Sequence, residues 1–288
     1  MACTHSLAVA IRGEVWRWGC ERLGQKTQLS IANAYVKNLL DPLDKRGGYC
    51  VEVFLTMDDR GGASGGGSHE PCHLRPGFNS TEAAYFAAFG KYLRNYHFVT
   101  TAHNQADSFR RTLEFYDQFS ANHDALIVVR HDVELTLSVD EWQCIGSHKL
   151  GLGAPMDMSI ESPGEPPLDP AHTPSCEDGV SDLVHYVPKK HYNAFAAMIG
   201  STNGTSPNEE PHLPWPSCNE VCGCFSKRHC EPNDISGHAC FAVAATLLPR
   251  SQIGFCWPKG GTVFSSWRPK NAAGKYFYDR PPLHGHDG

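Results

Sequence analysis

The sequence has no long apolar run and no excess of basic residues. No stretch of about 18 consecutive apolar residues occurs, so the sequence predicts no helix that spans a bilayer. Lys and Arg number 25 against 31 Asp and Glu, which gives a formal net charge of -6. A chain with this balance has no basic field for nucleic acid or for an anionic membrane surface. We therefore expect no nucleic-acid partner and no transmembrane segment.

Several short motifs with a known chemistry are also absent. The chain has neither the glycine-rich fingerprint of dinucleotide-binding folds nor the phosphate-binding loop of P-loop proteins. It also lacks the nucleophile elbow of serine hydrolases and the His-Glu-x-x-His helix of zinc proteases. These absences argue against a dinucleotide site, and they lower the expectation of a hydrolase without excluding it.

The targeting signals and the cysteines favour different compartments. The first ten residues contain no cationic segment, and their apolar stretch is too short for a signal peptide. In contrast, the chain contains 12 cysteines and two N-glycosylation acceptors, at Asn79 and Asn203. Asn79 is also explained as a helix cap. The cysteines and acceptors favour the Golgi or another secretory lumen, whereas the missing signal or anchor leaves the cytoplasm open.

Apolar runs alternate with amphipathic segments along the first two thirds of the chain. We expect strands at residues 7–11, 49–55, 96–100, 125–130, 183–187 and 253–257. We expect helices at residues 28–40, 80–94, 104–119, 189–199 and 235–248. The first of these helices is expected to stop at Asp41-Pro42. Strands that alternate with helices predict an α/β fold, with a mostly parallel sheet and helices on both faces.

The distribution of cysteines predicts a division of the chain. We expect an α/β core at residues 1–200, a polar linker at 201–217, and a small cysteine-rich C-terminal subdomain at 218–288 packed on the core. The last quarter contains six cysteines: Cys218, Cys222, Cys224, Cys230, Cys240 and Cys256. Their even number favours disulfides, while a zinc site that includes His229 and His238, or unpaired thiols, stays open.

Two segments place polar groups just after predicted strands, where ligands bind in open α/β sheets. Gly13 lets a ligand approach the backbone, and Arg12 could pair with a phosphate, although a turn glycine beside a surface arginine explains both equally well. Arg130, Asp132 and Glu134 project from one face if the chain stays extended. Asp132 and Glu134 would then share a divalent cation, Mn²⁺ or Mg²⁺. The alternative is that Arg130 simply pairs with a carboxylate at the strand end.

The order of these segments resembles a known family. An apolar strand that ends in Gly with a nearby Arg (LAVAIRGEVWR) is followed by a second strand (VEVFLTM) and an aromatic-rich helix (QADSFRRTLEFYDQF). Then come an apolar strand with an Arg-x-Asp step (ALIVVRHDVEL) and a strand with a helix (DLVHYVPKKHYNAFAAMI). Over residues 7–199 this order resembles the small glycosyltransferase-like proteins of bacterial, algal and large-virus polysaccharide pathways. His131 stands where that family usually has proline, and the cysteine-rich tail has no counterpart.

The resemblance implies a nucleotide-sugar-binding, glycosyltransferase-like fold. It implies that the protein transfers a sugar from a nucleotide-sugar donor to a hydroxyl group of a glycan or glycoconjugate acceptor. Arg12, Gly13, Arg130 and Asp132 would then line the nucleotide-sugar cleft. The leaving diphosphate needs cations, and Arg12, Arg130 and either Lys189 or Lys190 are available.

The resemblance leaves the catalytic base open among three residues. Asp132, Glu134 and His131 are the candidates, and a histidine would suit neutral pH. Two other functions also stay open. One is a non-catalytic carbohydrate-binding or interaction protein on the same fold, and the other is a zinc-stabilised cytosolic protein.

Overall fold

The computed structural model describes residues 3–46, 48–59, 70–99, 105–135, 137–142, 144–153, 184–201, 248–256 and 264–265. Within these ranges, its centre is a seven-stranded sheet with the order β3-β2-β1-β4-β7-β6-β8. The strands are β1 (His5–Val15), β2 (Tyr49–Asp59), β3 (Leu93–Phe98), β4 (Ala125–Arg130), β6 (Leu150–Leu152), β7 (Val184–Pro188) and β8 (Ile253–Phe255). A second sheet pairs β5 (Glu134–Leu135) with β9 (Phe264–Ser265).

The first four strands of the sheet are parallel to one another, and the direction changes at β7. Both β2 and β4 pair with β1 in parallel, and β3 pairs with β2 in the same way. β7 is antiparallel to β4 and to β6, whereas β8 is parallel to β6. The sheet is therefore mostly parallel, with one reversed strand inside it.

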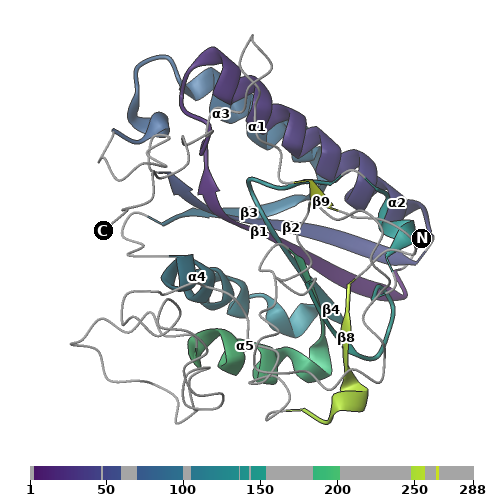
Figure 1. Ribbon diagram of the computed structural model, residues 1–288. Helices are drawn as coiled ribbons and strands as arrows, with labels where there is room; N and C mark the ends of the chain where they lie inside the picture. The colour runs from purple at the N-terminus through teal and green to yellow at the C-terminus, as the bar shows by residue number, and fades with distance from the viewer. Residues whose placement is uncertain are drawn as a thin grey trace, which may run out of the picture.

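Helices cover both faces of this sheet, as Figure 1 shows with α1 and α3 above it and α4 and α5 below it. The helices are α1 (Arg22–Tyr35), α2 (Asp41–Lys45), α3 (Asn79–Phe89), α4 (Gln105–Asp117) and α5 (Tyr192–Ser201). Alternate residues of β1 supply both cores, with Val9 and Ile11 in one and Ala8 and Ala10 in the other. This confirms the predicted α/β fold. No helix in the described ranges is long and apolar enough to cross a membrane.

Both ends of the first helix and the end of the next one differ from the prediction. The first helix begins at Arg22 rather than at residue 28, and a π-helical turn (Val36–Leu40) joins it to α2. The expected stop at Pro42 is wrong because this proline lies in the first turn of α2, where its missing N–H is not needed. The next helix ends at Phe89, and Leu93 already belongs to β3. Asn79 is the first residue of α3 and makes no cap hydrogen bond.

Three disulfides join described cysteines: Cys3–Cys50, Cys20–Cys72 and Cys144–Cys256. The expected use of cysteines in disulfides is confirmed for Cys256, the tail cysteine that the structure describes, although its partner Cys144 lies outside the tail. Cys256 pairs with Cys144 in the core, so it is not a zinc ligand, and it links the tail to the core sheet. The other five tail cysteines, most of the linker, Asn203 and nearly all of the helix expected at 235–248 lie outside the described residues.

The C-terminal extension also contributes to the core sheet itself. Residues Ile253–Phe255, expected to belong to a separate subdomain, form β8 beside β6. Cys256 follows immediately and is fully buried. The core therefore includes part of the chain beyond residue 250.

Candidate functional site

The order of the strands creates a topological switch point between β1 and β4. The chain passes from β1 to β2 and β3 on one side, and then crosses to β4 on the other side of β1. Ligands of open α/β sheets bind at the carboxyl ends of the strands at such a point. Arg12 of β1 is in register with Arg130 of β4, so both predicted segments end here. We call residues 13–17 and 130–132 the switch edge.

Asp132 is held at the switch edge by two arginines. Arg130 donates to its carboxylate from Nε at 2.7 Å and from Nη2 at 2.6 Å. Arg17 donates to the same carboxylate from Nη1 at 2.5 Å. The side chains of Arg17, Arg130 and Asp132 are 35%, 15% and 12% exposed, so Arg17 is the most accessible of the three. The sequence alternative in which Arg130 pairs with a carboxylate at the strand end is the one that the structure shows.

In this arrangement Asp132 and Glu134 do not fit a shared divalent cation. Both carboxylate oxygens of Asp132 accept hydrogen bonds from arginine, whose positive charge opposes a metal ion at the same place. The chain turns after Arg130, so the expected extended segment is not formed, and Glu134 lies in β5 opposite Ser265. Burial raises the pKa of Glu134. Among the residues that the structure describes, no group of three or more His, Cys, Asp and Glu side chains could hold a metal.

His131 is fully buried and fixes the turn after β4. Its Nδ1 accepts a hydrogen bond from the Tyr85 hydroxyl at 2.6 Å, and its Nε2 donates to the Thr56 carbonyl at 3.1 Å. Burial lowers the pKa of His131 to about 4, so the ring is neutral at pH 7. Since both ring nitrogens are engaged and the residue is 0% exposed, His131 does not reach an acceptor hydroxyl. Its position is structural.

Gly13 belongs to the switch edge and Arg12 directly precedes it, but the two residues differ in access. The Arg12 side chain is fully buried, with its guanidinium carbon 3.7 Å from the centre of the Phe109 ring. It packs beneath the edge and is not open to a phosphate. Gly13 has a φ of +94°, and apart from its two chain neighbours no atom of the described residues lies within 4 Å of the place where a Cβ would stand. The described part of the chain therefore leaves room beside this backbone, which the ligand-approach and turn-glycine interpretations of the sequence both allow.

Lys189 lies at the opposite edge of the sheet. It follows Pro188, which pairs with Ala125 at the amino end of β4. Because β7 is antiparallel to β4, the carboxyl end of β7 lies at the amino end of β4, away from the switch edge. The length of β4, about 20 Å at roughly 3.3 Å per residue, separates the two ends. The Lys189 ammonium donates to the Ala121 carbonyl at 2.7 Å. The structure therefore does not bring Lys189 together with Arg12, Gly13 or Arg130.

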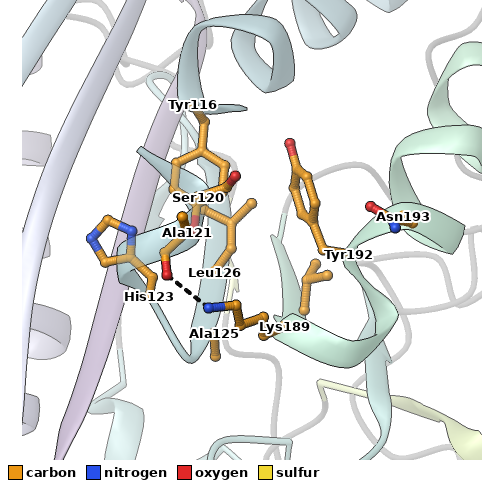
Figure 2. Close-up of a pocket in the computed structure, with 10 residues that line it drawn as sticks. Tyr116, Ser120, Ala121, His123, Ala125, Leu126, Lys189, Tyr192 and Asn193 are labelled. Atoms are coloured by element: carbon orange, nitrogen blue, oxygen red, sulfur yellow. Dashed lines mark hydrogen bonds between the residues drawn. The ribbon is translucent and has the colours of Figure 1, made fainter. Parts of the chain in front are cut away.

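A pocket of about 220 Å³ lies at this opposite edge. Figure 2 shows Lys189 and Tyr192 on one side and Tyr116 and His123 on the other, with the hydrogen bond from Lys189 to Ala121 between them. Burial raises the pKa of both tyrosines, so their hydroxyl groups stay protonated. None of the switch-edge residues lines this pocket.

Helix α1 ties the two halves of the switch edge together. The side chain of Gln28 is fully buried, and its Nε2 donates to the His131 carbonyl at 2.9 Å. Its Oε1 accepts from the Trp16 backbone N–H at 3.3 Å. Trp16 has a φ of 59°, which is unusual for a bulky residue. Tyr35 donates from its hydroxyl to the Arg130 carbonyl, and burial raises its pKa. The sequence analysis missed Gln28 and Tyr35, although polar side chains on the inner face of a helix could have indicated them.

β2 brings a further polar pair to the same edge of the sheet. Asp59 is in register with Val15 of β1. Its carboxylate accepts from the backbone N–H groups of Cys72 at 3.0 Å and His73 at 2.9 Å. The same carboxylate lies 2.8 Å from the imidazole Nδ1 of His73. Two consecutive aspartates after an apolar strand could have indicated this site, but nothing in the sequence joins them to His73.

Comparisons with known proteins give little beyond this geometry. No family model and no curated protein matches the chain. A solved structure of an active-site mutant of LgtC matches with a TM-score of 0.33 and 12% identity, over 65% of this chain and 58% of that chain. The galactosyltransferase LgtC in complex with donor and acceptor sugar analogues matches with a TM-score of 0.32 and 10% identity, over 65% and 59%. The chain thus spans less than two thirds of either, and similarity this low carries no argument about function.

Proposed function

We propose that this protein is a glycosyltransferase that moves a sugar from a nucleotide-sugar donor to a hydroxyl group of a glycan or glycoconjugate acceptor. The observation that carries the proposal is the placement of Arg17, Arg130 and Asp132 at the switch point between β1 and β4. This is the place where open α/β sheets bind ligands, and a nucleoside diphosphate needs fixed cations there. The resemblance of residues 7–199 to glycosyltransferase-like proteins supports the same conclusion.

In the proposed transfer, Arg17 binds the diphosphate of the donor. Its side chain is the most exposed of the three, and a guanidinium group matches phosphate oxygens in a bidentate geometry. As the bond between the anomeric carbon and the diphosphate oxygen breaks, the electron pair stays on the diphosphate, and Arg17 stabilises that charge. Asp132 positions Arg17 and Arg130. The open backbone at Gly13 lets the donor approach β1.

The disulfides support an oxidising location for this activity. Among the described residues, six cysteines form three bonds. Disulfides persist mainly in secreted and lumenal proteins. We therefore propose the Golgi or another secretory lumen as the compartment.

One observation favours a second candidate function, a carbohydrate-binding protein without catalysis. Both oxygens of Asp132 are engaged by arginine, and His131 is buried, so neither residue is available as a base at the switch edge. A protein that kept the fold and lost the chemistry would have this arrangement. It would bind glycan without a nucleotide.

A thermal-shift screen separates the two functions. UDP, GDP, CMP and their sugars are tested with and without Mn²⁺ on the wild type, Arg17→Ala, and the control Arg94→Ala, which removes an exposed arginine on β3. A ligand at 100 times its Kd stabilises the native state by about 2.7 kcal/mol. We expect one nucleotide class to raise the Tm of the wild type and of Arg94→Ala. The Kd of Arg17→Ala for the same nucleotide should be at least about tenfold higher.

Two outcomes of this screen would contradict the proposed donor site. If no nucleotide raises the Tm of the wild type but a glycan does, the carbohydrate-binding function is correct and the transferase is wrong. A nucleotide shift that is equal in Arg17→Ala and the wild type would show that the donor binds elsewhere. A dependence on Mn²⁺ would show a cation site outside the Asp132 cluster described above.

A further inference from the structure

We propose that His73, held by Asp59, is the general base that removes the proton from the acceptor hydroxyl. This inference rests on the proposed transferase function and supplies the base that the switch edge lacks. It concerns two residues that neither the sequence patterns nor the comparisons assign to a site.

The geometry of the pair is that of an oriented histidine. Nδ1 of His73 lies 2.8 Å from Oδ2 of Asp59, so this nitrogen carries the proton and donates to the carboxylate. Asp59 itself is fixed, because its carboxylate also accepts two backbone N–H groups and its side chain is only 1% exposed. The other ring nitrogen, Nε2, is then an acceptor. It makes no hydrogen bond to any residue that the structure describes.

The imidazole is also held in place by packing while part of it stays open. Its ring stacks on Phe98 of β3, with the ring centres 4.5 Å apart and an angle of 29° between the planes. The side chain of His73 is 21% exposed. A carboxylate on one nitrogen, an aromatic ring against one face and an accessible second nitrogen are the features of a histidine that acts as a base. His131, by contrast, has both nitrogens engaged.

A disulfide fixes this pair to the loop that carries Arg17. Cys72, the residue before His73, is bonded to Cys20, and their Cα atoms are 5.3 Å apart. Since neighbouring Cα atoms are about 3.8 Å apart, the Cα of His73 lies within about 9 Å of that of Cys20. Arg17 precedes Cys20 by three residues, inside a turn closed by a 2.8 Å hydrogen bond from Gly19 N–H to the Trp16 carbonyl. The base and the proposed diphosphate-binding arginine therefore belong to one cross-linked unit.

The proposed step is a single displacement in which every bond is accounted for. The proton of the acceptor hydroxyl passes to Nε2 of His73, and the freed electron pair on oxygen forms a bond to the anomeric carbon. The bond from that carbon to the diphosphate breaks, and its electron pair stays on the diphosphate beside Arg17. Asp59 stabilises the imidazolium, which later loses its proton to water. A single displacement of this kind inverts the configuration of the sugar.

The charges around the imidazole define what its pH dependence reports. Asp59 lies on β2, Glu82 lies on α3, and Arg75 lies two residues along the same turn. The pKa of Glu82 is raised, first by burial and also by the charge of Asp59, and His73 lowers it. Glu82 is thus a second titratable group beside the imidazole, and its own contribution to the pH profile must be removed. The variant Glu82→Gln separates the two.

The test measures release of the nucleotide from UDP- and GDP-sugars, with water or a glycan as acceptor, in otherwise unchanged protein. We expect His73→Gln to lower kcat by about 10²–10⁴-fold, the usual contribution of a general base, while the nucleotide shift in Tm stays the same. The pH profile of kcat/KM is recorded for the wild type and for each variant, and a general base gives it a limb that rises with pH. That rise disappears in His73→Gln and persists in Glu82→Gln. The control His97→Gln, which removes an exposed histidine on β3, keeps full turnover.

Two further measurements decide the matter independently. NMR of ¹⁵N-labelled protein should show the neutral His73 ring with its proton on Nδ1, and the sugar product should have inverted configuration. A proton on Nε2, a retained configuration, or full turnover in His73→Gln would each overturn the inference. A wild type that binds no nucleotide would instead contradict the proposed function, so the two failures are distinguishable.

Discussion

Replacing Gln28 tests whether α1 holds the two halves of the switch edge together. Its amide accepts from the Trp16 N–H and donates to the His131 carbonyl, and the residue is 0% exposed. Gln28→Leu fills the same space but leaves both backbone groups buried without a partner. Each such group costs about 1–3 kcal/mol, so the free energy of unfolding should fall by about 2–6 kcal/mol.

Urea titrations followed by tryptophan fluorescence, without reductant, measure this loss. Lys26→Leu is the matched control, because it places leucine on the exposed face of the same helix and should change stability by less than about 0.5 kcal/mol. Gln28→Glu adds a second readout. A buried glutamic acid must keep its proton to donate to the His131 carbonyl, so its folded pKa is raised above the unfolded value near 4.3. The stability of Gln28→Glu relative to the wild type is therefore highest below about pH 4 and falls as the pH rises. A Gln28→Leu protein that unfolds at the same urea concentration as the wild type would refute the reasoning.

Three other predictions concern the same region and the sheet edge. Burial lowers the pKa of His131 to about 4, so between about pH 6.5 and 4 the unfolded chain binds a proton that the native protein does not. The free energy of unfolding should therefore fall by about 3 kcal/mol as the pH is lowered from about 6.5 to 4. Urea titrations at several pH values measure this fall, which should be smaller in His131→Asn. Asp132→Ala should cost on the order of 3 kcal/mol because it leaves two arginines without their carboxylate, whereas Arg17→Ala should cost less than about 1 kcal/mol; equal losses would contradict this. Removing the Cys144–Cys256 disulfide, which spans 112 residues, should cost about 4–5 kcal/mol and lower the Tm, and non-reducing peptide mapping should recover the linked peptides.

The parts of the fold that the sequence predicted best are those buried on both faces. The run at 125–130 was placed correctly because a strand covered by helices on two sides needs a continuous apolar sequence. The end of the first helix was misplaced because a proline stops a helix only when it lies in its interior, and Pro42 begins a new one. Short strands such as β6, with three residues, are set by their neighbours and leave no pattern of their own.

The candidate site was only partly predictable. The sequence correctly brought Gly13, Arg130 and Asp132 to one edge, since parallel strands place their carboxyl ends together. The shared cation at Asp132 and Glu134 was expected because side chains alternate between the two faces of an extended strand. That alternation ends after β4, where the chain turns. Lys189 was expected at the same edge, but β7 runs antiparallel to β4 and carries it to the opposite edge. The direction of β7 is decided by its pairing with β4 and not by its own residues, so the sequence did not reveal it.

The interactions that complete the site join residues far apart in the sequence. Gln28 bonds His131 across 103 positions, and the Cys20–Cys72 bond spans 52. No local pattern carries information on such contacts. The Asp59–His73 pair is closer, 14 positions apart, but it depends on the turn that follows β2 and on the disulfide beside it.

The position of β8 also has a consequence for the order in which the protein is made. β6 ends at Leu152, and the strand that covers its outer side begins only at Ile253. At 5–20 residues per second, the ribosome needs roughly 5–20 s to add the intervening chain. Once β7 has been made and has paired with β6, β6 is an unpaired sheet edge until β8 follows, beside a cysteine whose partner has not been synthesised. Such edges recruit other strands. A cell that makes this protein therefore needs to protect Cys144 and the β6 edge until residues 253–256 emerge.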